Sequence, residues 1–434
     1  MTLPDPMLIY LFLSPLFCLA LLRPQWAILA CLAILPTYLL KLSLFGIPTT
    51  VLELSIYTTY IGSFLSILFS NGLNFVNLDL LKNWKLKIKN SKTSLLWPIA
   101  AWLIITLISA LFSENIQTAL GGWKAWVFDP LLVLILIIQF FDQKNIWKIV
   151  ASLGLSSAVL SAYGLFEYFF SPHQLGDERL DSVFDPANYH AMLVGPIIVL
   201  LIGLIFSSQI PRIWKYLLGT ASAINIIALI FTFSYGGYLA VLGGLVIYGF
   251  LTLNRDQKRK MIIGALITLI AFIIIAAPTK KFQDLFEFQE RSSSHARLEI
   301  WQTSYLIFKE HPILGVGLNN FESAYRENIP RVAFPPLEWL VAQPHNLYLA
   351  LLTQTGLLGF LVFIYLIVRF FQIIGVARYK LQDTRYALLS SLSAILIHGL
   401  VDTPYFKNDL SIIFWLIIAL MIIHTRHIAL ENNQ

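Results

Sequence analysis

The sequence predicts an all-α polytopic membrane protein, a bundle of 12–13 transmembrane helices with one large helical extracytoplasmic loop. Hydrophobic residues make up 57% of the 434 residues, charged residues make up only 12%, and the mean hydropathy is +0.73. An ordinary soluble domain carries about 25% charged residues, so too few charges are present to cover a soluble surface. Apolar runs recur along nearly the whole chain, which favours one integral membrane domain over several soluble ones.

The transmembrane helices are predicted from the length of these apolar runs. A bilayer core of about 30 Å requires about 20 apolar residues in a helix. The first two runs are short and separated only by residues 23–25, so they form either two spans or one hairpin. The predicted spans are residues 8–22, 26–41, 50–69, 95–112, 126–141, 149–170, 188–206, 217–233, 238–253, 261–277, 347–371, 387–400 and 410–424. Three regions follow: N-terminal transmembrane helices in 1–277, an extracytoplasmic loop in 278–346, and C-terminal transmembrane helices in 347–434.

The orientation follows from the basic residues, which cluster in short loops near residues 82–92, 212–215, 255–260 and 378–385. The alternation of spans puts these four loops on one side, and the positive-inside rule makes that side the cytoplasm. The net charge of +6 is explained in this way, so we expect no nucleic-acid partner. The long segment 278–346 then lies outside.

No cofactor or metal is expected. The two cysteines, Cys18 and Cys31, are isolated within apolar runs, which gives neither a disulfide framework nor a zinc-type spacing. No glycine-rich loop of the P-loop type occurs.

Residues 294–310 of the outer loop show apolar residues at a spacing of three to four, which predicts an amphipathic helix. The predicted apolar face consists of Leu298, Trp301, Tyr305 and Phe308. We expect the helix to end before Pro312, because a residue that precedes proline disfavours the helical conformation.

Three loop residues are candidates for chemistry. Arg297 offers a planar fork of donors that can grip a phosphate, although it could equally be a surface arginine paired with Glu299. His345, directly before the apolar run that starts at Leu347, can accept a proton near neutral pH, and its neighbour Asn346 can orient it or bind substrate. A histidine at a helix start with a purely structural role is the alternative.

Short outer loops are expected beside this segment. Asn188 and His190 open one span, residues 231–238 link two others, and residues 398–402 (His-Gly-Leu-Val-Asp) end a third. Ionisable groups near spans are costly and often functional, but side chains of this kind also bond neighbouring helices.

Taken together, these segments resemble the O-antigen ligase family, which also contains O-antigen polymerases and O-linked oligosaccharyltransferases. The resemblance covers roughly residues 150–424. It is carried by an ordered set of motifs: Arg297–Trp301, His311–Phe321, Pro344–Leu349, Thr355–Gly359, Phe184–Asn188 and His398–Asp402.

The resemblance implies a polytopic, lipid-carrier-using glycosyltransferase that acts at the outer face of the cytoplasmic membrane. The implied donor is a glycan on undecaprenyl pyrophosphate, and the implied acceptor is a hydroxyl of lipid A-core, of a surface polymer or of a protein. Ligase activity is favoured over polymerase activity. By position, Arg297 matches the arginine that holds the pyrophosphate, and His345 matches the histidine that activates the acceptor. Asn346 and Asn188 are further candidates for contacts with the substrate.

One position departs from the family pattern. Tyr235 follows Ser234 where family members often carry an arginine, which is a second pyrophosphate contact in the resemblance. Tyr235 can donate one hydrogen bond but brings no charge. Either another cation substitutes, with Arg331, Arg326 and Lys124 as candidates, or the donor chemistry of this protein differs from that of the family.

Two alternatives remain at this point. A transporter or flippase of lipid-linked glycans is the first, although ionisable residues are sparse within the spans. A non-catalytic assembly subunit with a docking loop is the second, and it predicts that Arg297 and His345 lie far apart.

Overall fold

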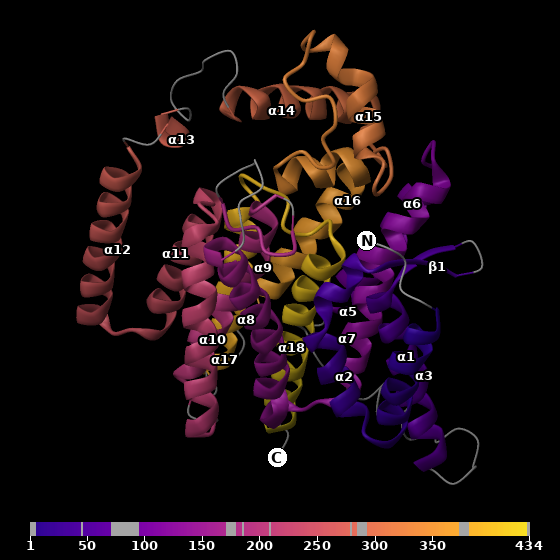
Figure 1. Cartoon of the computed structure of the whole chain (residues 1–434), viewed down its shortest axis with the longest axis vertical. Coiled ribbons are helices and arrows are strands. Elements are labelled where there is room, and N and C mark those ends of the chain that lie inside the picture. The colour runs from indigo at the N-terminus through magenta and orange to yellow at the C-terminus, as the bar shows by residue number, and fades with distance from the viewer. Residues whose placement is uncertain are drawn as a thin grey trace.

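Helices form nearly all of the regular structure, as an upright bundle with a smaller helical group standing on one end (Figure 1). The computed structural model describes residues 6–44, 47–70, 95–170, 179–184, 186–207, 210–277, 280–283, 293–372 and 382–431. Within these residues the strands are limited to one short antiparallel pair. The predicted polytopic helical fold is confirmed.

The elements of the first part of the chain form one side of the bundle. In order they are α1 (Pro6–Leu22), α2 (Pro24–Ala33), the 3₁₀ turn η1 (Leu35–Leu39), β1 (Lys41–Leu44), β2 (Ile47–Thr50), α3 (Val51–Ser70), α5 (Leu96–Leu111), α6 (Ile116–Trp123), the π-helical turn η2 (Lys124–Phe128), α7 (Asp129–Phe140), the 3₁₀ turn η3 (Gln143–Asn145) and α8 (Ile146–Phe170).

The second part completes the bundle and supplies the outer helical group. It contains α9 (Asn188–Ile205), α10 (Arg212–Phe231), α11 (Tyr235–Thr252), α12 (Arg255–Ala276), α13 (Lys280–Gln283), α14 (Ser293–Glu310), α15 (Phe321–Asn328), the 3₁₀ turn η4 (Ile329–Arg331), α16 (Leu347–Gln372), α17 (Gln382–His398) and α18 (Asn408–Glu431).

In the described part of the chain, eight helices are long and apolar enough to cross a membrane, and three shorter apolar helices accompany them. Every predicted apolar run overlaps a helix. The second run differs in extent, because α2 ends at Ala33 after 10 residues. Ten helical residues rise about 15 Å, roughly half of a bilayer core, so α2 alone is too short to span. This favours the hairpin alternative for the first two runs.

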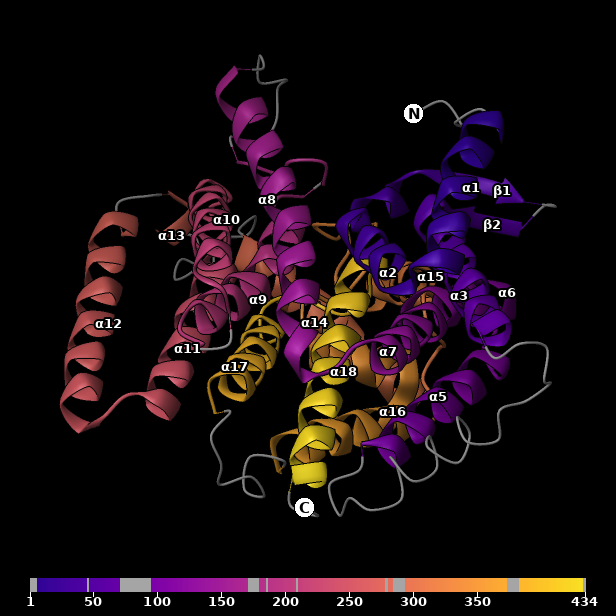
Figure 2. The same cartoon turned by 90° about the horizontal axis from the view of Figure 1, so that it is seen from below.

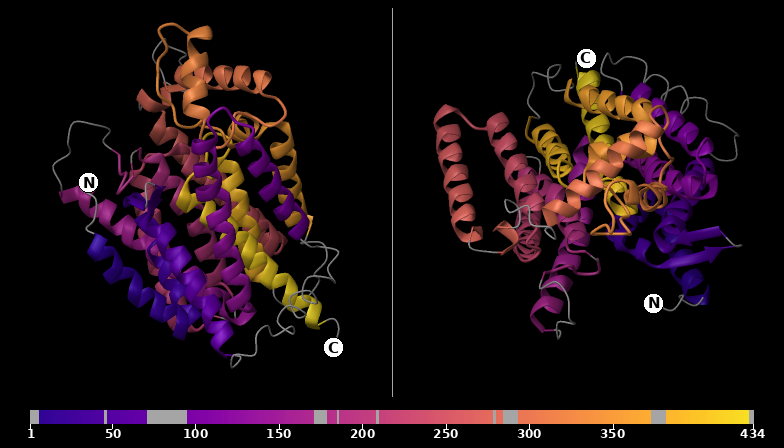
Figure 3. Two further views of the ribbon diagram at one scale, coloured as in Figure 1. Left: turned by 90° about the vertical axis from the view of Figure 1, so that its right-hand side faces the viewer. Right: turned by 90° about the horizontal axis from the view of Figure 1, so that it is seen from above.

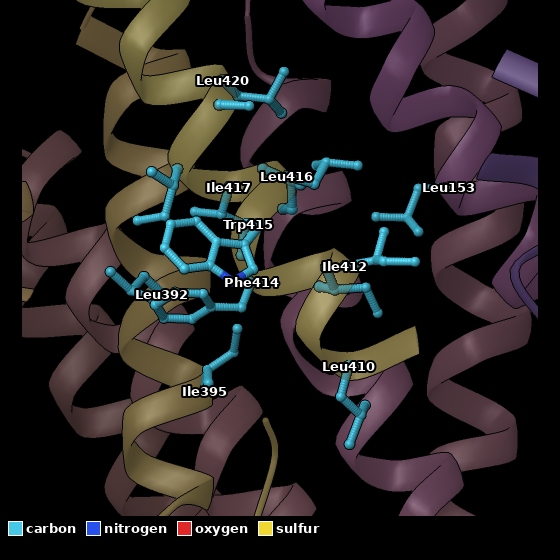
Figure 4. Packing of buried hydrophobic residues seen from close by; sticks show 14 of the residues in the cluster. Leu153, Leu392, Ile395, Leu410, Ile412, Phe414, Trp415, Leu416, Ile417 and Leu420 are labelled. Atoms are coloured by element: carbon cyan, nitrogen blue, oxygen red, sulfur yellow. The ribbon is translucent and has the colours of Figure 1, made fainter. Parts of the chain in front are cut away.

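The centre of the bundle is α18, which is buried on all sides. Phe414, Trp415 and their neighbours up to Met421 have no exposed surface. Figure 4 shows these side chains together with Leu392 and Ile395 of α17. A helix that is apolar all round belongs in the interior of a protein, so α18 is the element around which the spans pack.

The edge of the bundle is formed by α12, which stands apart from the other helices beside α11 (Figure 2). The link between α11 and α12, where the basic segment 255–260 begins, lies at the end opposite to α14 (Figure 1). The predicted basic loop at 82–92 lies outside the described residues, and so do residues 378–380 of another.

The outer helical group has a small core of its own, separate from the core of the bundle. Phe321 and Tyr325 of α15 are fully buried in it. Its other buried members are Ile300, Ile307, Val316, Ile329 and Val341. Residues 293–346 of the predicted loop therefore form a folded unit.

The predicted helix in this loop is present as α14, which ends at Glu310 as expected, but its predicted apolar face is only partly correct. Trp301 packs against the small core described above. Leu298 is 40% exposed and Tyr305 is 54% exposed. The buried face instead carries Ile300, Thr303 and Ile307. Large aromatic side chains dominated the pattern, whereas the packing uses two isoleucines separated by small hydroxyl residues that can bond the preceding turn.

A break in α16 docks this outer unit onto the bundle. Gly356 has a φ of +63°, a conformation that suits glycine, and it interrupts the helix. The break frees backbone carbonyls: Thr353 O accepts from the Val316 amide at 2.9 Å and Gln354 O accepts from the Gly317 amide at 3.1 Å. The glycines near 315 and 356 thus belong to one backbone contact between residues 316–317 and residues 353–354, which is called the Gly356 joint below.

Candidate functional site

The orange helices α14 and α15 lie at one end of the bundle (Figure 3, left), and contacts at that end bring together four segments distant in sequence. His345 lies just before α16, and Asp402 lies in the connection between α17 and α18. Asn188 is the first residue of α9, and Arg297 lies in the first turns of α14. Each of these side chains is therefore fixed by a helix end or by a short connection.

The centre of the site is a histidine–aspartate pair. His345 Nδ1 lies 3.2 Å from Asp402 Oδ1. Asp402 is 4% exposed, and its carboxylate also accepts hydrogen bonds from the Thr403 amide and from Asn188 Nδ2, both at 3.0 Å. The His345 side chain is 31% exposed. An Nδ1–H donated to a buried carboxylate leaves Nε2 as the proton acceptor on the accessible side.

The contact shifts the pKa of both His345 and Asp402. Burial raises the pKa of Asp402, but the hydrogen bond and charge of His345, together with the nearby His398 and Arg297, lower it to about 2. Burial lowers the pKa of His345, yet the hydrogen bond and charge of Asp402 outweigh this, so that the pKa of His345 lies above its ordinary value. His345 is therefore a stronger base than a free imidazole.

The backbone around His345 is held in an unusual conformation. His345 has a φ of +50°, which is uncommon for a residue other than glycine. The next residue fixes it: Asn346 Oδ1 accepts from the amides of Tyr348 and Leu349 at 3.0 Å, as an N-cap of α16 does. Asn346 Nδ2 donates to Leu400 O at 2.9 Å. In this structure the Asn346 side chain is thus engaged in positioning His345.

Arg297 faces the same site from α14. Trp301, one turn further on the same face, donates its indole N–H to Pro344 O at 3.0 Å, directly beside His345. The charge of Arg297 lowers the pKa of both His345 and Asp402. Glu299, the suspected partner of Arg297, instead accepts from the Leu337 amide. Among the described residues no hydrogen bond or ion pair engages the Arg297 guanidinium.

The three cations expected to replace the missing arginine are placed elsewhere. Arg331 is paired with Glu310 at 2.6 Å, and Lys124 is paired with Glu53 at 2.6 Å. Arg326 is exposed on α15. None of the three is among the groups whose charge acts on His345 or Asp402.

Tyr235 begins α11 and takes part in an aromatic cluster. Its ring lies 5.3 Å from that of Phe272 on α12 and 6.3 Å from that of Phe282 on α13. The Tyr235 side chain thus contributes to the packing between α11, α12 and α13.

Sequence reasoning missed Arg179, the nearest cation on the α9 side. Its Nε donates to Thr232 O at 2.7 Å and its terminal nitrogen donates to Asn188 Oδ1 at 2.5 Å. The charge of Arg179 also acts on Tyr238 in α11. Its position nine residues before Asn188, at the start of a short outer connection, was the only signal for it in the sequence.

A second missed cation is Lys407, which ends the connection that carries Asp402. Its ammonium lies 3.5 Å from the ring centroid of Tyr189, 4.6 Å from that of Phe184 and 5.5 Å from that of Tyr38. Burial lowers the pKa of Lys407 to about 8, although Asp409 opposes this. The attraction between the ammonium and the faces of these rings offsets part of the cost of burying the charge.

This arrangement can perform acid–base chemistry on a hydroxyl next to an anion. A buried carboxylate contacts a partly exposed imidazole, and a guanidinium that no other described residue engages lies close enough for its charge to act on both. Such a site suits a reaction in which an alcohol loses a proton while negative charge develops on a leaving group.

Comparison with known proteins agrees with the resemblance in the central part of the chain. Residues 220–364 match the family model described as O-antigen ligase, a segment that includes Arg297 and His345. No curated protein sequence matches the chain. A chain from a solved structure described as "Structural coordination of polymerization and crosslinking by a peptidoglycan synthase complex" is 14% identical, with a TM-score of 0.46, over 76% of this chain and 96% of that chain.

Proposed function

We propose that this protein is a glycosyltransferase of the O-antigen ligase type that moves a glycan from undecaprenyl pyrophosphate to a hydroxyl acceptor. The acceptor is lipid A-core, a surface polymer or a protein, and the reaction takes place at the outer face of the cytoplasmic membrane. The observation that carries the proposal is the His345–Asp402 pair at one end of an apolar helical bundle, within reach of the charge of Arg297, which no other described residue engages in a hydrogen bond or ion pair. The match of residues 220–364 to the O-antigen ligase family supports it.

The proposed reaction assigns one role to each group. His345 Nε2 takes the proton of the acceptor hydroxyl while the acceptor oxygen forms a bond to the anomeric carbon of the glycan. The bond from that carbon to the pyrophosphate oxygen breaks, and the electron pair leaves with the pyrophosphate. Arg297 meets the developing charge, and Asp402 stabilises the imidazolium that forms.

The other candidate functions are less well supported. A docking subunit without catalysis predicts that Arg297 and His345 are remote, whereas the charge of Arg297 acts on His345. A flippase has no use for an oriented base, so it leaves the short contact between His345 and Asp402 without a purpose. A polymerase would use the same groups and differ only in its acceptor.

The test is transfer in proteoliposomes supplied with an undecaprenyl-pyrophosphate-linked glycan and, in separate reactions, each class of acceptor. Arg297→Ala is expected to lower the rate by about 100- to 1000-fold, as the loss of one oriented donor does. His345→Ala is expected to lower it by about 100- to 10,000-fold, as the loss of a general base does. Arg331→Ala, which removes a cation paired with Glu310, is the matched control.

Each outcome has a defined meaning. Retained transfer in the Arg297→Ala and His345→Ala proteins would show that the mechanism is wrong. Glycan movement across the bilayer without any covalent product would replace the proposal with a flippase. Chain growth on a lipid-linked acceptor alone would identify a polymerase.

A further inference from the structure

The carboxylate of Asp402 is held from two sides by different parts of the chain. On one side it contacts His345, and on the other Asn188 Nδ2 donates to its Oδ2 at 3.0 Å. Asn188 Oδ1 in turn accepts from Arg179 at 2.5 Å. A continuous chain of polar contacts therefore runs from Arg179 through Asn188 and Asp402 to His345.

The chemistry of its neighbours fixes the orientation of the Asn188 amide. A guanidinium can only donate hydrogen bonds, so the amide oxygen must face Arg179. An ionised carboxylate can only accept them, so the amide nitrogen must face Asp402. Arg179 is itself held by the carbonyl of Thr232, at the end of α10. The orientation of Asp402 is thus determined by groups outside the pair that it forms with His345.

We infer that Asn188 and Arg179 are positioning residues that hold Asp402, and through it His345, in the geometry needed for proton transfer. This inference rests on the proposed function, and it gives Asn188 a role different from the substrate contact that the sequence suggested. Displacement of a catalytic group by about 1 Å can lower a rate about 100-fold, so a support of this kind has a measurable effect.

The pKa of His345 provides a readout that does not depend on activity. The charged groups that act on His345 are Asp402 from the α17–α18 connection, Arg297 from α14 and Glu338 from the segment before α16. If Asn188 keeps Asp402 in contact with His345, its removal weakens the effect that raises this pKa. The pKa of His345 is then expected to fall.

The experiment is the pH dependence of carbethoxylation of His345 in the intact protein in nanodiscs, measured by mass spectrometry. Only the neutral imidazole reacts, so the midpoint reports the pKa. Asn188→Ala is expected to lower the midpoint by at least about half a pH unit, and Asp402→Asn by more. Arg179→Gln, a second variant in case the first does not fold, is expected to lower it less. His311 of the same protein is the internal reference.

A double-mutant cycle separates positioning from direct substrate contact. With Asp402→Asn already present, Asn188→Ala is expected to cause no further shift, because its route to His345 is gone. The matched control is Asn225→Ala, which removes a buried asparagine bonded to Ser157 and Ser161 within the bundle. It is expected to lower thermal stability without moving the midpoint.

Two results would overturn the inference: an unchanged midpoint in both Asn188→Ala and Arg179→Gln, or an equal shift with and without Asp402. Transfer assays then distinguish it from the proposed function. Loss of the proposed function would appear as unaffected transfer in the His345→Ala protein, whatever the midpoints are. If the proposed function and this inference are both correct, the Asn188 and Arg179 variants that retain transfer should show a rate that is about 10- to 100-fold lower. The acid limb of their pH–rate profile should shift in the same direction as the carbethoxylation midpoint.

Discussion

At the residue scale, His345 is subject to opposing effects. Burial disfavours its charged form, and Asp402 favours that form more strongly, so its pKa lies above the ordinary value. Arg297 acts in the opposite direction to Asp402. A base that must be neutral to accept a proton therefore responds in opposite ways to the loss of these two neighbours.

We expect this opposition in the pH dependence of transfer. In the wild-type protein activity rises with pH as His345 loses its proton, with a midpoint above 6.5. Asp402→Asn lowers the pKa of His345 and shifts this acid limb to lower pH. Arg297→Lys, which keeps the charge but loses the planar fork, lowers the rate with little shift, and Arg297→Ala shifts the limb to higher pH. Rates of transfer between pH 5 and 9 measure all three. Shifts of the same sign in Asp402→Asn and Arg297→Ala would contradict the assignment.

His345 and Arg297 could be predicted from the sequence, because each is an unusual residue type at a recognisable place. Asp402 was predicted only as part of a motif, and Arg179 was not predicted. Their importance comes from contacts with residues that are far away in the chain. Asp402 lies 57 positions from His345 and 214 from Asn188. Residue type and local spacing carry no information on such contacts. For the same reason Lys124 and Arg331 were reasonable candidates until their partners, Glu53 and Glu310, were seen.

At the element scale, helix ends and breaks position the site more than helix faces do. Asn346 caps α16, Asn188 begins α9, and the break at Gly356 holds the outer unit against α16. Apolar periodicity predicted where the spans lie, since that signal is local. The same signal predicted the packed face of α14 only in part, because the fully buried positions combine Ile300 and Ile307 with the hydroxyl residues between them.

The joint at Gly356 gives a prediction at this scale. A Cβ at this position would lie 2.2 Å from the Ile313 carbonyl oxygen, and the backbone conformation is strained for any other residue. Gly356→Ala is therefore expected to destabilise the protein by at least about 1–3 kcal/mol and to expose the 293–346 segment to protease. Thermal unfolding and limited proteolysis in detergent measure both effects.

The matched control is Gly219→Ala in α10, where an added Cβ meets nothing within 4 Å. It is expected to leave both measurements unchanged. If the two variants behaved alike, the outer unit would not depend on this joint for its position.

At the scale of the whole molecule, the described charged and polar groups of the site gather at one end of an apolar bundle. The basic segment at the start of α12 lies at the opposite end (Figure 1). The positive-inside rule predicts that this end faces the cytoplasm, and therefore that the site faces outward. A donor carried by a lipid in the outer leaflet can reach the site only with this orientation, so orientation is a condition of the proposed function.

Thiol labelling tests the orientation directly. In a Cys18→Ser, Cys31→Ser background, an impermeant maleimide added to intact cells, with the outer membrane made permeable where there is one, is expected to label the Arg326→Cys variant on α15. It is not expected to label the Arg255→Cys variant at the start of α12, because that exposed position is predicted to face the cytoplasm. After the cytoplasmic membrane is permeabilised both variants should react, which controls for access. Labelling of Arg255→Cys alone in intact cells would place His345 and Asp402 on the cytoplasmic side, out of reach of a donor in the outer leaflet, and the proposed reaction would have to be abandoned.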